Sequence, residues 1–232
     1  MLGRLAPEVA WPTPDSETGA NRSRRAVELG AGAARQRYTR PMASPARKPA
    51  TYEDLLRLPD DKIGEIVDGE LYASPRPSGA HAGSAFELGL DLGQAFQRGR
   101  GGPGGWLFLF EPELRLDGDT LVPDLAGWRR ERLPKVPDTP AITLAPDWVC
   151  EILSPSTEKV DRTRKLPAYA RHGVCHAWLI NPLARTLEVY RREGTSWVLV
   201  ASHADDALVR AEPFDAIELD LLRLWGEERA SG

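Results

Sequence analysis

Apolar residues recur in short blocks from residue 51 onward, and polar or turn-forming residues separate these blocks. Apolar runs of about four to eight residues are typical of strands, whereas an apolar stripe at a spacing of three or four residues is typical of a helix. We predict strands at 63–67, 71–73, 106–110, 113–116, 121–128, 148–153, 174–180, 186–190 and 197–201. We predict helices at 51–59, 81–98, 157–171 and 217–225.

Turn and capping residues support these boundaries. The Asp68-Gly69 pair separates the first two predicted strands and is a strong signal for a two-residue hairpin turn. Residues 51–54 resemble a capping box, and Gly173 is a natural end for the helix at 157–171. The order of elements predicts an α/β or α+β fold, in which a mixed β-sheet is flanked by helices and an N-terminal β-hairpin precedes it.

Residues 1–50 have a different composition, rich in Ala, Arg, Pro, Ser and Gly and without sustained periodicity. This composition predicts a disordered N-terminal extension. Met42 is the second of only two methionines, and we expect it to be the true start of the protein, with a genuine tail as the alternative. We expect residues 51–232 to form a single domain.

Composition limits the class of protein. With 232 residues, 41% hydrophobic and 28% charged, the chain has the values of a soluble globular protein with a sizeable core. No apolar run approaches the roughly 20 residues that cross a bilayer, so we expect no membrane association. The two cysteines, Cys150 and Cys175, lie in apolar runs. A disulfide framework is therefore ruled out, and we expect a reducing, cytoplasmic location.

The formal net charge of -4 argues against a polybasic surface but leaves room for a locally basic groove. Residues 1–41 contain seven arginines and four acidic residues, so residues 42–232 carry a net charge of -7. The acidity therefore belongs to the predicted domain. Part of it is a set of carboxylates that a bound cation would neutralise.

Two acidic residues interrupt apolar strands: Asp124 within 121–126 and Glu151 within 148–153. Burying a carboxylate without a partner costs several kcal/mol, so each requires a metal, a cation or several hydrogen bonds. Two carboxylates on neighbouring strands would form a cradle for a hard divalent cation such as Mg²⁺. The alternative is that each acid pairs with an arginine or caps the end of a strand.

Lysine is scarce, with five lysines against 25 arginines, and two of them lie in the helix that follows the Glu151 strand. Lys165 follows Asp161 by four residues, which is the spacing of a surface ion pair worth a few tenths of a kcal/mol. The alternative is that the Lys165 ammonium reaches the carboxylates. It would then stabilise charge that builds on a phosphate, or orient the attacking water.

Several segments together resemble one known family. They are Val122-Pro123-Asp124, the run from Glu151 to Thr157, and the spaced series Asp161, Lys165, Tyr169 and Gly173. These segments are similar to the Uma-two family of restriction-endonuclease-like proteins, which have the fold of PD-(D/E)xK nucleases. Residues 65–71, His81 and residues 178–182 match as well, and the likeness covers roughly residues 51–225.

The resemblance implies roles for three residues. Asp124 corresponds to the Asp of the PD element and Glu151 to the (D/E), so both would be ligands of Mg²⁺ or Mn²⁺. Leu153 stands where the motif has lysine. In this family the lysine is thought to lie in the following helix, which implies Lys165, with Lys159 as the alternative.

The resemblance also suggests supporting residues. Glu65 would add a carboxylate to the metal site or be an ordinary strand-end acid, and Ile152 would offer its backbone carbonyl to the metal. His81 would contact a phosphate or cap its helix. Arginines such as Arg162 and Arg164 would line the approach for nucleic acid.

The activity that the resemblance implies is metal-dependent endonucleolytic hydrolysis of DNA, with a homodimer as a further expectation because such nucleases often need two copies to cut both strands. One alternative is a non-catalytic member that keeps the fold as a nucleic-acid-binding or protein-interaction module. Another is a phosphodiesterase acting on something other than DNA, because fold alone does not fix the substrate.

Overall fold

The computed structural model describes residues 48–229. The predictions for residues 1–47, including the extension and the start at Met42, lie outside the described residues. A short helix, α1 (Tyr52–Leu55), opens the described chain, and its Thr51 and Asp54 form the predicted capping box.

The predicted N-terminal hairpin is confirmed and belongs to a small antiparallel sheet. β1 (Lys62–Val67) pairs with β2 (Glu70–Pro75) across a turn in which Asp68 and Gly69 have φ of 53° and 74°. Both residues adopt the left-handed conformation that a tight hairpin turn requires. β4 (Leu114–Leu116) and β5 (Asp119–Leu121) complete the sheet in the order β2-β1-β5-β4.

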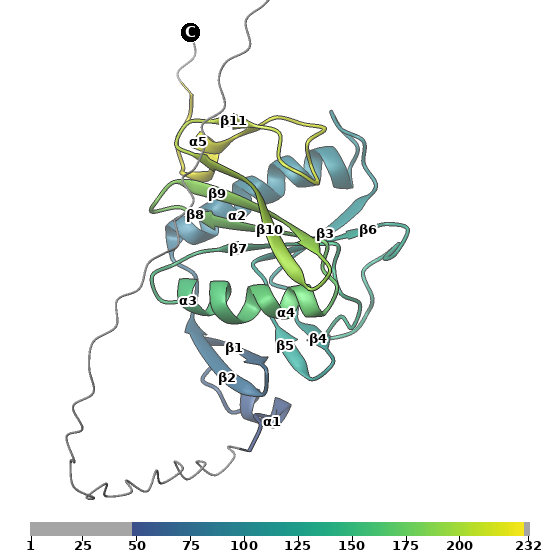
Figure 1. Ribbon diagram of the computed structural model, residues 1–232, viewed down its shortest axis with the longest axis vertical. Helices are drawn as coiled ribbons and strands as arrows, with labels where there is room; N and C mark the ends of the chain where they lie inside the picture. The colour runs from purple at the N-terminus through teal and green to yellow at the C-terminus, as the bar shows by residue number, and fades with distance from the viewer. Residues whose placement is uncertain (1–47, 230–232) are drawn as a thin grey trace, which may run out of the picture. The chain divides into compact units, whose positions relative to one another are not determined.

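A larger, six-stranded sheet has the order β10-β9-β8-β7-β6-β3 (Figure 1). Its strands are β3 (Trp106–Phe110), β6 (Leu125–Arg129), β7 (Trp148–Ile152), β8 (His176–Asn181), β9 (Thr186–Glu193) and β10 (Ser196–Ala204). Only β7 and β8 are parallel, and every other pair is antiparallel. The sheet is mixed, as the sequence predicts.

Helices cover both faces of this larger sheet. α2 (Gly79–Leu92), its π-helical continuation η1 (Gly93–Gln97) and α5 (Leu221–Leu224) lie on one side. The connection from β7 to β8 lies on the other side, between the two sheets (Figure 1). It consists of α3 (Glu158–Val160), the π-helical η2 (Asp161–Lys165) and α4 (Leu166–Arg171).

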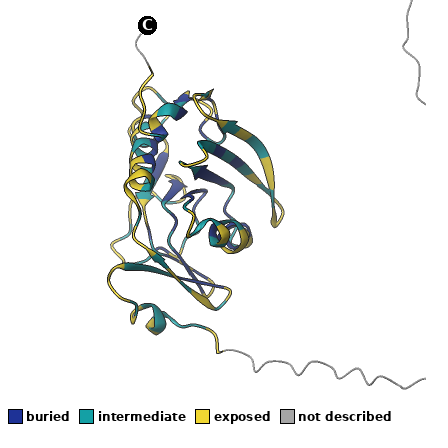
Figure 2. Cartoon of the chain, turned by 90° about the vertical axis from the view of Figure 1, so that its left-hand side faces the viewer, coloured by how far each residue is buried: buried dark blue, intermediate teal, exposed yellow. Residues whose placement is uncertain are grey.

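Each face of the larger sheet has its own core, and the most buried segments are its central strands (Figure 2). Because side chains alternate along a strand, Trp148, Cys150 and Ile152 enter the core under α2. Val149 and Leu153 enter the core under α4. Glu151 shares their parity, so it faces the helix that carries Lys165.

The strand predicted at 121–128 is wrong in one respect, because the chain changes sheets within it. β5 ends at Leu121 in the small sheet, and β6 begins at Leu125 in the large one. Pro123 lies in the intervening link, and proline has no N–H to donate to a β ladder. The two sheets are therefore joined at Val122-Pro123-Asp124.

The predicted C-terminal helix at 217–225 is also too long. α5 begins only at Leu221, because the Asp220 side chain caps it by accepting a hydrogen bond from the Leu222 amide. The preceding residues form β12 (Leu219–Asp220), which pairs with β11 (Leu208–Val209). The predicted helix at 51–59 is likewise too long, because α1 ends at Leu55. The predicted helices at 81–98 and 157–171 have nearly the observed limits but contain the π-helical turns η1 and η2, which periodicity does not reveal.

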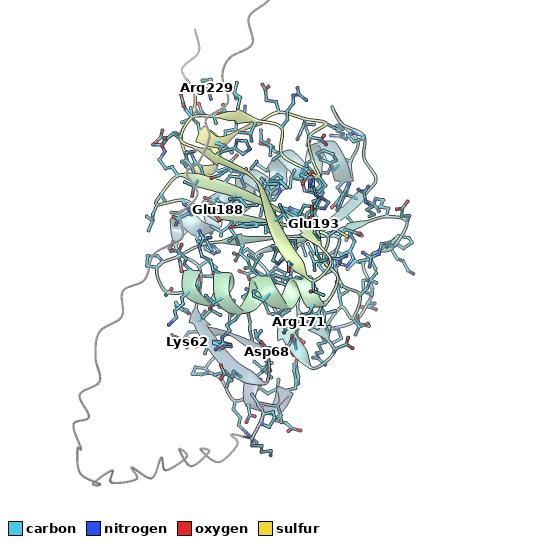
Figure 3. All side chains as sticks on the ribbon, in the orientation of Figure 1. Lys62, Asp68, Arg171, Glu188, Glu193 and Arg229 are labelled. Carbon is cyan, nitrogen blue, oxygen red and sulfur yellow. The ribbon has the colours of Figure 1, made fainter. Side chains whose placement is uncertain are left out.

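Asp119 fastens the small sheet to the end of α4. Its Oδ2 lies 2.8 Å from His172 Nε2 and 3.3 Å from Arg171 Nη2, and its Oδ1 accepts a hydrogen bond from the Asp68 amide. Arg171 also reaches Asp68 directly, and the two labelled side chains meet at this junction (Figure 3). This contact fixes β1 relative to the helix that carries Lys165. Within residues 48–229, no helix has the length and apolar character to cross a membrane.

Phe214 is the centre of the core beneath α2, so truncating it should destabilise the whole domain. Its ring centroid lies 4.8 to 5.5 Å from those of Phe96, Trp106, Phe108, Trp148 and Trp178. We expect Phe214→Ala to lower the free energy of unfolding in urea by about 3–5 kcal/mol. Leu183→Ala, at a side chain that is 72% exposed, should change it by less than about 0.5 kcal/mol. Equal effects of the two substitutions would contradict this assignment of the core.

Candidate functional site

The register of two adjacent strands brings Asp124 and Glu151 together. β6 and β7 are antiparallel and pair Leu125 with Cys150, so one further step sets Asp124 opposite Glu151. The Ile152 amide donates a 2.6 Å hydrogen bond to Asp124 Oδ2. The Glu151 side chain is 4% exposed and the Asp124 side chain 16%. The two acids are neighbours, with Asp124 on the open side.

The Lys165 side chain extends from η2 toward the carboxylates of Glu65, Glu151 and Asp161. Its Nζ lies 3.0 Å from Glu151 Oε2 and 3.0 Å from Glu65 Oε1, and it donates to the Val122 carbonyl at 3.1 Å. Asp161 Oδ1 is 3.7 Å away, and both side chains of that pair are buried. The surface ion-pair alternative for Asp161 and Lys165 is therefore wrong.

Lys159 occupies a different environment from Lys165. It is exposed, and it is not among the residues that line the pocket around the acids. Of the two lysines that the sequence leaves open, Lys165 is the one in contact with the carboxylates.

Glu65 connects the small sheet to the cluster. Its Oε1 accepts hydrogen bonds from the Val122 amide, at 2.7 Å, and from Lys165. The residue is 5% exposed. The Val122 backbone is thus held at both polar atoms, its N–H by Glu65 and its C=O by Lys165. A strand-end acid in solvent would not make these contacts.

Two site residues had no assigned role from the sequence. Tyr169 is fully buried and donates a 2.5 Å hydrogen bond to Glu151 Oε1, and Asp161 lies beside the Lys165 ammonium. Asp161, Lys165 and Tyr169 are spaced by four residues, which sets them on one side of a helix. That spacing was a usable signal, because three polar residues on a helix facing a core imply a buried polar cluster.

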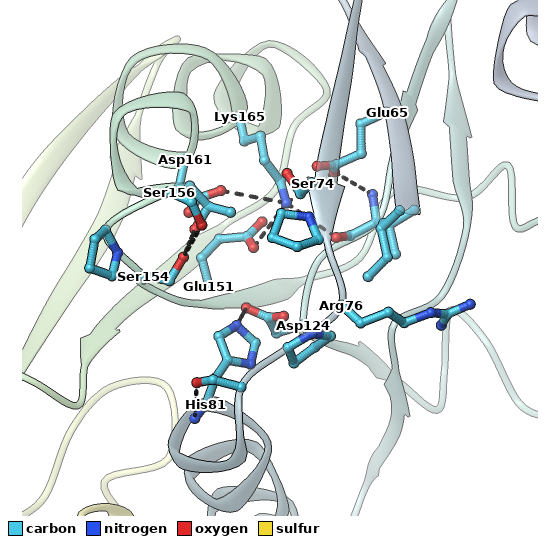
Figure 4. Close-up of a pocket in the computed structure, with 17 residues that line it drawn as sticks. Glu65, Ser74, Arg76, His81, Asp124, Glu151, Ser154, Ser156, Asp161 and Lys165 are labelled. Atoms are coloured by element: carbon cyan, nitrogen blue, oxygen red, sulfur yellow. Dashed lines mark hydrogen bonds and ion pairs between the residues drawn. The ribbon is translucent and has the colours of Figure 1, made fainter. Parts of the chain in front are cut away.

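His81 lies in the first turn of α2 and points at Asp124 (Figure 4). Its Nε2 is 3.2 Å from Asp124 Oδ2, while the helix is capped by the Ser78 side chain. Burial opposes a charge on this imidazole. The hydrogen bond and charge of Asp124, with Asp161 and Glu111 adding, outweigh burial and raise the pKa of His81.

The two arginines proposed for the approach lie outside the pocket. Arg162 makes a forked ion pair with Glu188, at 2.8 and 2.9 Å, and also binds Glu158. Arg164 is half exposed, 3.9 Å from Glu70. Neither lines the cavity around the acids. Arg76 does line its rim, with its guanidinium directed away from the carboxylates (Figure 4).

The carboxylates form the floor of a cavity of about 260 Å³. Its wall is built from the end of β2, the start of α2 and the loop that follows β7. The hydroxyl-bearing residues Ser74, Ser154 and Ser156 and the imidazole of His81 face it (Figure 4). A polar cavity of this size, lined by donors and acceptors, can hold a small charged group such as a phosphate.

Burial shapes the protonation of the cluster. Desolvation raises the pKa of Glu151 well above its ordinary value, and Asp161, Asp124 and Glu65 add to this against Lys165. Desolvation also raises the pKa of Asp161, to about 6, again against Lys165. The Lys165 pKa is opposed by burial but lies well above its ordinary value because carboxylates surround the ammonium. We therefore take Lys165 to be charged, with the excess negative charge on the acids.

The donor set suits a hard cation at Asp124 and Glu151. Three acids (Glu65, Glu151 and Asp161) lie around the Lys165 ammonium and a fourth, Asp124, lies beside Glu151, so their full ionisation leaves an excess of negative charge. Within residues 48–229, no three His, Cys, Asp or Glu side chains converge as a metal cluster. The Lys165 ammonium separates Glu65 from Glu151. Mg²⁺ is compatible with this arrangement because it commonly uses only one or two carboxylates plus waters and phosphate oxygens.

Comparison with known proteins gives a similar solved structure and a matching family. A solved structure described as "a putative nuclease belonging to DUF820" from Anabaena variabilis ATCC 29413 is similar, with a TM-score of 0.63 and 25% sequence identity. The match covers 77% of this chain and 98% of that chain. No curated protein matches the chain. A family model, Uma2, described as "Putative restriction endonuclease", matches residues 50–222. The chain therefore belongs to the Uma2 family.

Proposed function

We propose that the chain is a metal-dependent endonuclease that hydrolyses phosphodiester bonds in DNA, with residues 51–232 as a single catalytic domain. The observation that carries the proposal is the meeting of Asp124, Glu151 and Lys165 at the floor of one polar cavity. Membership of a restriction endonuclease family supports the same chemistry.

Asp124 and Glu151 would hold Mg²⁺ or Mn²⁺, with the Ile152 carbonyl as a further donor. The bound cation would polarise the scissile phosphate and lower the pKa of the attacking water. Lys165 would offset negative charge that develops on the phosphate. Tyr169 orients Glu151 through the hydrogen bond to its Oε1, and Glu65 orients Lys165.

His81 would carry a proton or contact a phosphate oxygen at the mouth of the site. Its Nε2 pairs with Asp124, which faces the open side of the cavity. The raised pKa of His81 favours the charged imidazolium, which attracts an anion. Arg76, at the rim, would add a second positive charge along the approach.

A second candidate function is a non-catalytic nuclease-fold module that binds nucleic acid or protein. One observation favours it: the Lys165 ammonium already bridges Glu65 and Glu151, so the cluster is partly neutralised by the chain itself. Against it, Asp124 Oδ1 makes no hydrogen bond with any described residue, so the acid on the open side keeps a free oxygen. Metal titration separates the two candidates.

Removing the buried acid should abolish metal-dependent cleavage. We expect Glu151→Gln to lower the rate of plasmid nicking in Mg²⁺ or Mn²⁺ by at least about 100-fold, because a neutral amide is a poor ligand for a hard cation. EDTA should have the same effect on the wild type. Glu193→Gln, at an exposed acid on β9, is the matched control and should cut normally. Normal cutting by Glu151→Gln, or no measurable metal affinity in the wild type, would contradict the proposal.

Substitutions at Lys165 and Lys159 should have different effects on the cleavage rate. Lys165→Met should lower cleavage by about 100- to 1,000-fold, the usual effect of deleting one group that stabilises transition-state charge. Lys159→Met removes the same charge from the same helical connection and should leave the cleavage rate within about twofold. Circular dichroism checks that both variants fold. If Lys159→Met lost activity and Lys165→Met did not, Lys159 would be the lysine that stabilises the transition state.

The charge excess predicts a dependence of stability on pH. The pKa of Asp161 is raised to about 6, so the folded chain holds this proton more tightly than the unfolded chain does. Its contribution to stability is complete at low pH and is lost as pH rises through about 6. In EDTA, Asp161→Asn should gain about 2–3 kcal/mol in free energy of unfolding relative to wild type between pH 4 and pH 8. Urea denaturation at the two values measures this, with Glu193→Gln as the control. If the free energies of unfolding of wild type and Asp161→Asn changed equally between pH 4 and pH 8, the raised pKa of Asp161 would be refuted.

A further inference from the structure

A second cavity adjoins the carboxylate site and has a different character. It also measures about 260 Å³, and it shares Pro77, His81 and Asp124 with the first cavity. The rest of its lining is Ala82, Ala85, Phe86, Phe110 and Glu111. The two cavities are thus neighbours across His81 and Asp124, one polar and one largely apolar.

Two exposed aromatic rings form the wall of this apolar cavity. Phe86 on α2 is 58% exposed and Phe110 at the end of β3 is 52% exposed. Large aromatic side chains in a monomer gain stability by burial, so exposure of two on one wall indicates a binding surface. Leu90, one turn beyond Phe86 on α2, is 50% exposed and continues the same apolar strip.

The position of the Phe110 side chain depends on a glycine in α2, Gly89. The Phe110 ring lies directly over Gly89, and a methyl group there would overlap the ring. The helix interior disfavours glycine by up to about 1 kcal/mol relative to alanine. The close contact is a reason for glycine at this position, and it seats the tip of the ring against the helix beside the cavity.

The volume and polarity of the apolar cavity limit the kind of ligand that it can bind. Pockets for drug-sized ligands span about 300–1,000 Å³, so 260 Å³ suits a single ring system better than a larger molecule. Apolar walls with exposed ring faces suit a flat, neutral group. The Glu111 carboxylate at the rim offers an acceptor for an N–H donor on the edge of a base, such as the ring N–H of thymine. Glu111 is held there by its amide, which donates to the Asp124 carbonyl, and its φ is +43°.

We propose that the Phe86–Phe110 cavity binds one unstacked nucleobase of the nucleic acid, next to the phosphate that a cation on Asp124 and Glu151 would hold. This inference rests on the proposed nuclease function and deepens it. A base paired and stacked in a duplex cannot present its face to a side chain, so the bound strand is single-stranded or locally unpaired at this nucleotide. The substrate class is therefore single-stranded or splayed DNA.

The same exposed rings would suit a second copy of this chain, but two features favour the base. The surface is a hollow continuous with the site of chemistry, where a strand must pass. Stable protein interfaces bury about 800 Å² per partner, whereas the exposed large apolar side chains here are three, Phe86, Leu90 and Phe110. Dimerisation through this face is an outcome that the test below detects.

The test compares a fluorescein-labelled oligothymidylate with an abasic backbone of the same length, by fluorescence anisotropy at low salt in Ca²⁺, which takes oxygen ligands as Mg²⁺ does. Stacking of one base is worth roughly 5- to 150-fold in affinity, and we expect wild type to prefer the oligothymidylate by that factor. Phe86→Ala/Phe110→Ala should bind both probes equally, with unchanged affinity for the abasic backbone. Annealing the oligothymidylate to its complement should also remove the preference.

Matched variants separate stacking from general apolar contact and from folding. Phe86→Tyr keeps a ring and should keep the preference, whereas Phe86→Leu should lose most of it. Gly89→Ala should lower the preference by displacing Phe110. Gly93→Ala makes the same change on the same helix, where a methyl group meets no atom within 4 Å, and should have no effect.

Three results would overturn the inference. They are a wild type without base preference, a double variant that keeps it, and a double variant that changes only from dimer to monomer in analytical ultracentrifugation. Glu151→Gln keeps this test apart from the nuclease proposal, because it should lose cleavage and retain base preference. Base preference in a wild type that cuts no DNA would support the cavity and defeat the nuclease function. Cleavage of DNA by a wild type without base preference would support the nuclease function and defeat the proposed base-binding cavity.

Discussion

The structure around the site depends on one buried ammonium. Lys165 lies within 3.0 Å of Glu65 and of Glu151 and also binds the Val122 carbonyl, so it joins three segments that are distant in sequence. Isolated buried charges cost several kcal/mol, and breaking such a cluster leaves the remaining charges without a partner. The contact therefore constrains where the small sheet, the large sheet and the helical connection meet. Tyr169 and Asp161, on the same helix, complete the polar shell around it.

The link between the two sheets turns this constraint into a site. Because the chain changes sheets at Val122-Pro123-Asp124, Asp124 stands immediately before the first residue of β6, where its side chain meets the opening of the cavity. Glu151, one strand away, is closed off by the helix. The pair thus combines a buried acid and an accessible one. This difference suits a cation that must be held by the protein and still reach a phosphate.

The proposed function requires an acidic protein to bind nucleic acid, which is itself negatively charged. The net charge of -4 gives no general affinity for a polyanion, so binding must come from local features. Under the two proposals, the cluster would supply a negative cavity for a cation, and the adjoining rings of Phe86 and Phe110 would supply contacts to a neutral base. Phosphate and base would then be recognised separately on the two sides of His81 and Asp124. Affinity would then depend less on surface arginines, and Arg162 is already paired with Glu188.

The sequence by itself determined the hairpin at Asp68-Gly69, most strands and the helix at 157–171, and it drew attention to Asp124 and Glu151, because these are encoded by local turn chemistry, periodicity and charges set in apolar runs. It left Lys165 and Lys159 open, and only the tertiary contacts of Lys165 with Glu65 and Glu151 distinguish the two lysines. It did not determine the sheet change at Pro123 or the short C-terminal helix, which depend on hydrogen-bond partners far along the chain. The partners of Tyr169 and Arg162 also required tertiary structure, since Glu151 and Glu188 lie on strands of the large sheet that only folding brings to this helix. The apolar cavity is likewise a tertiary feature, because Phe86, Gly89 and Phe110 meet only when β3 packs beside α2.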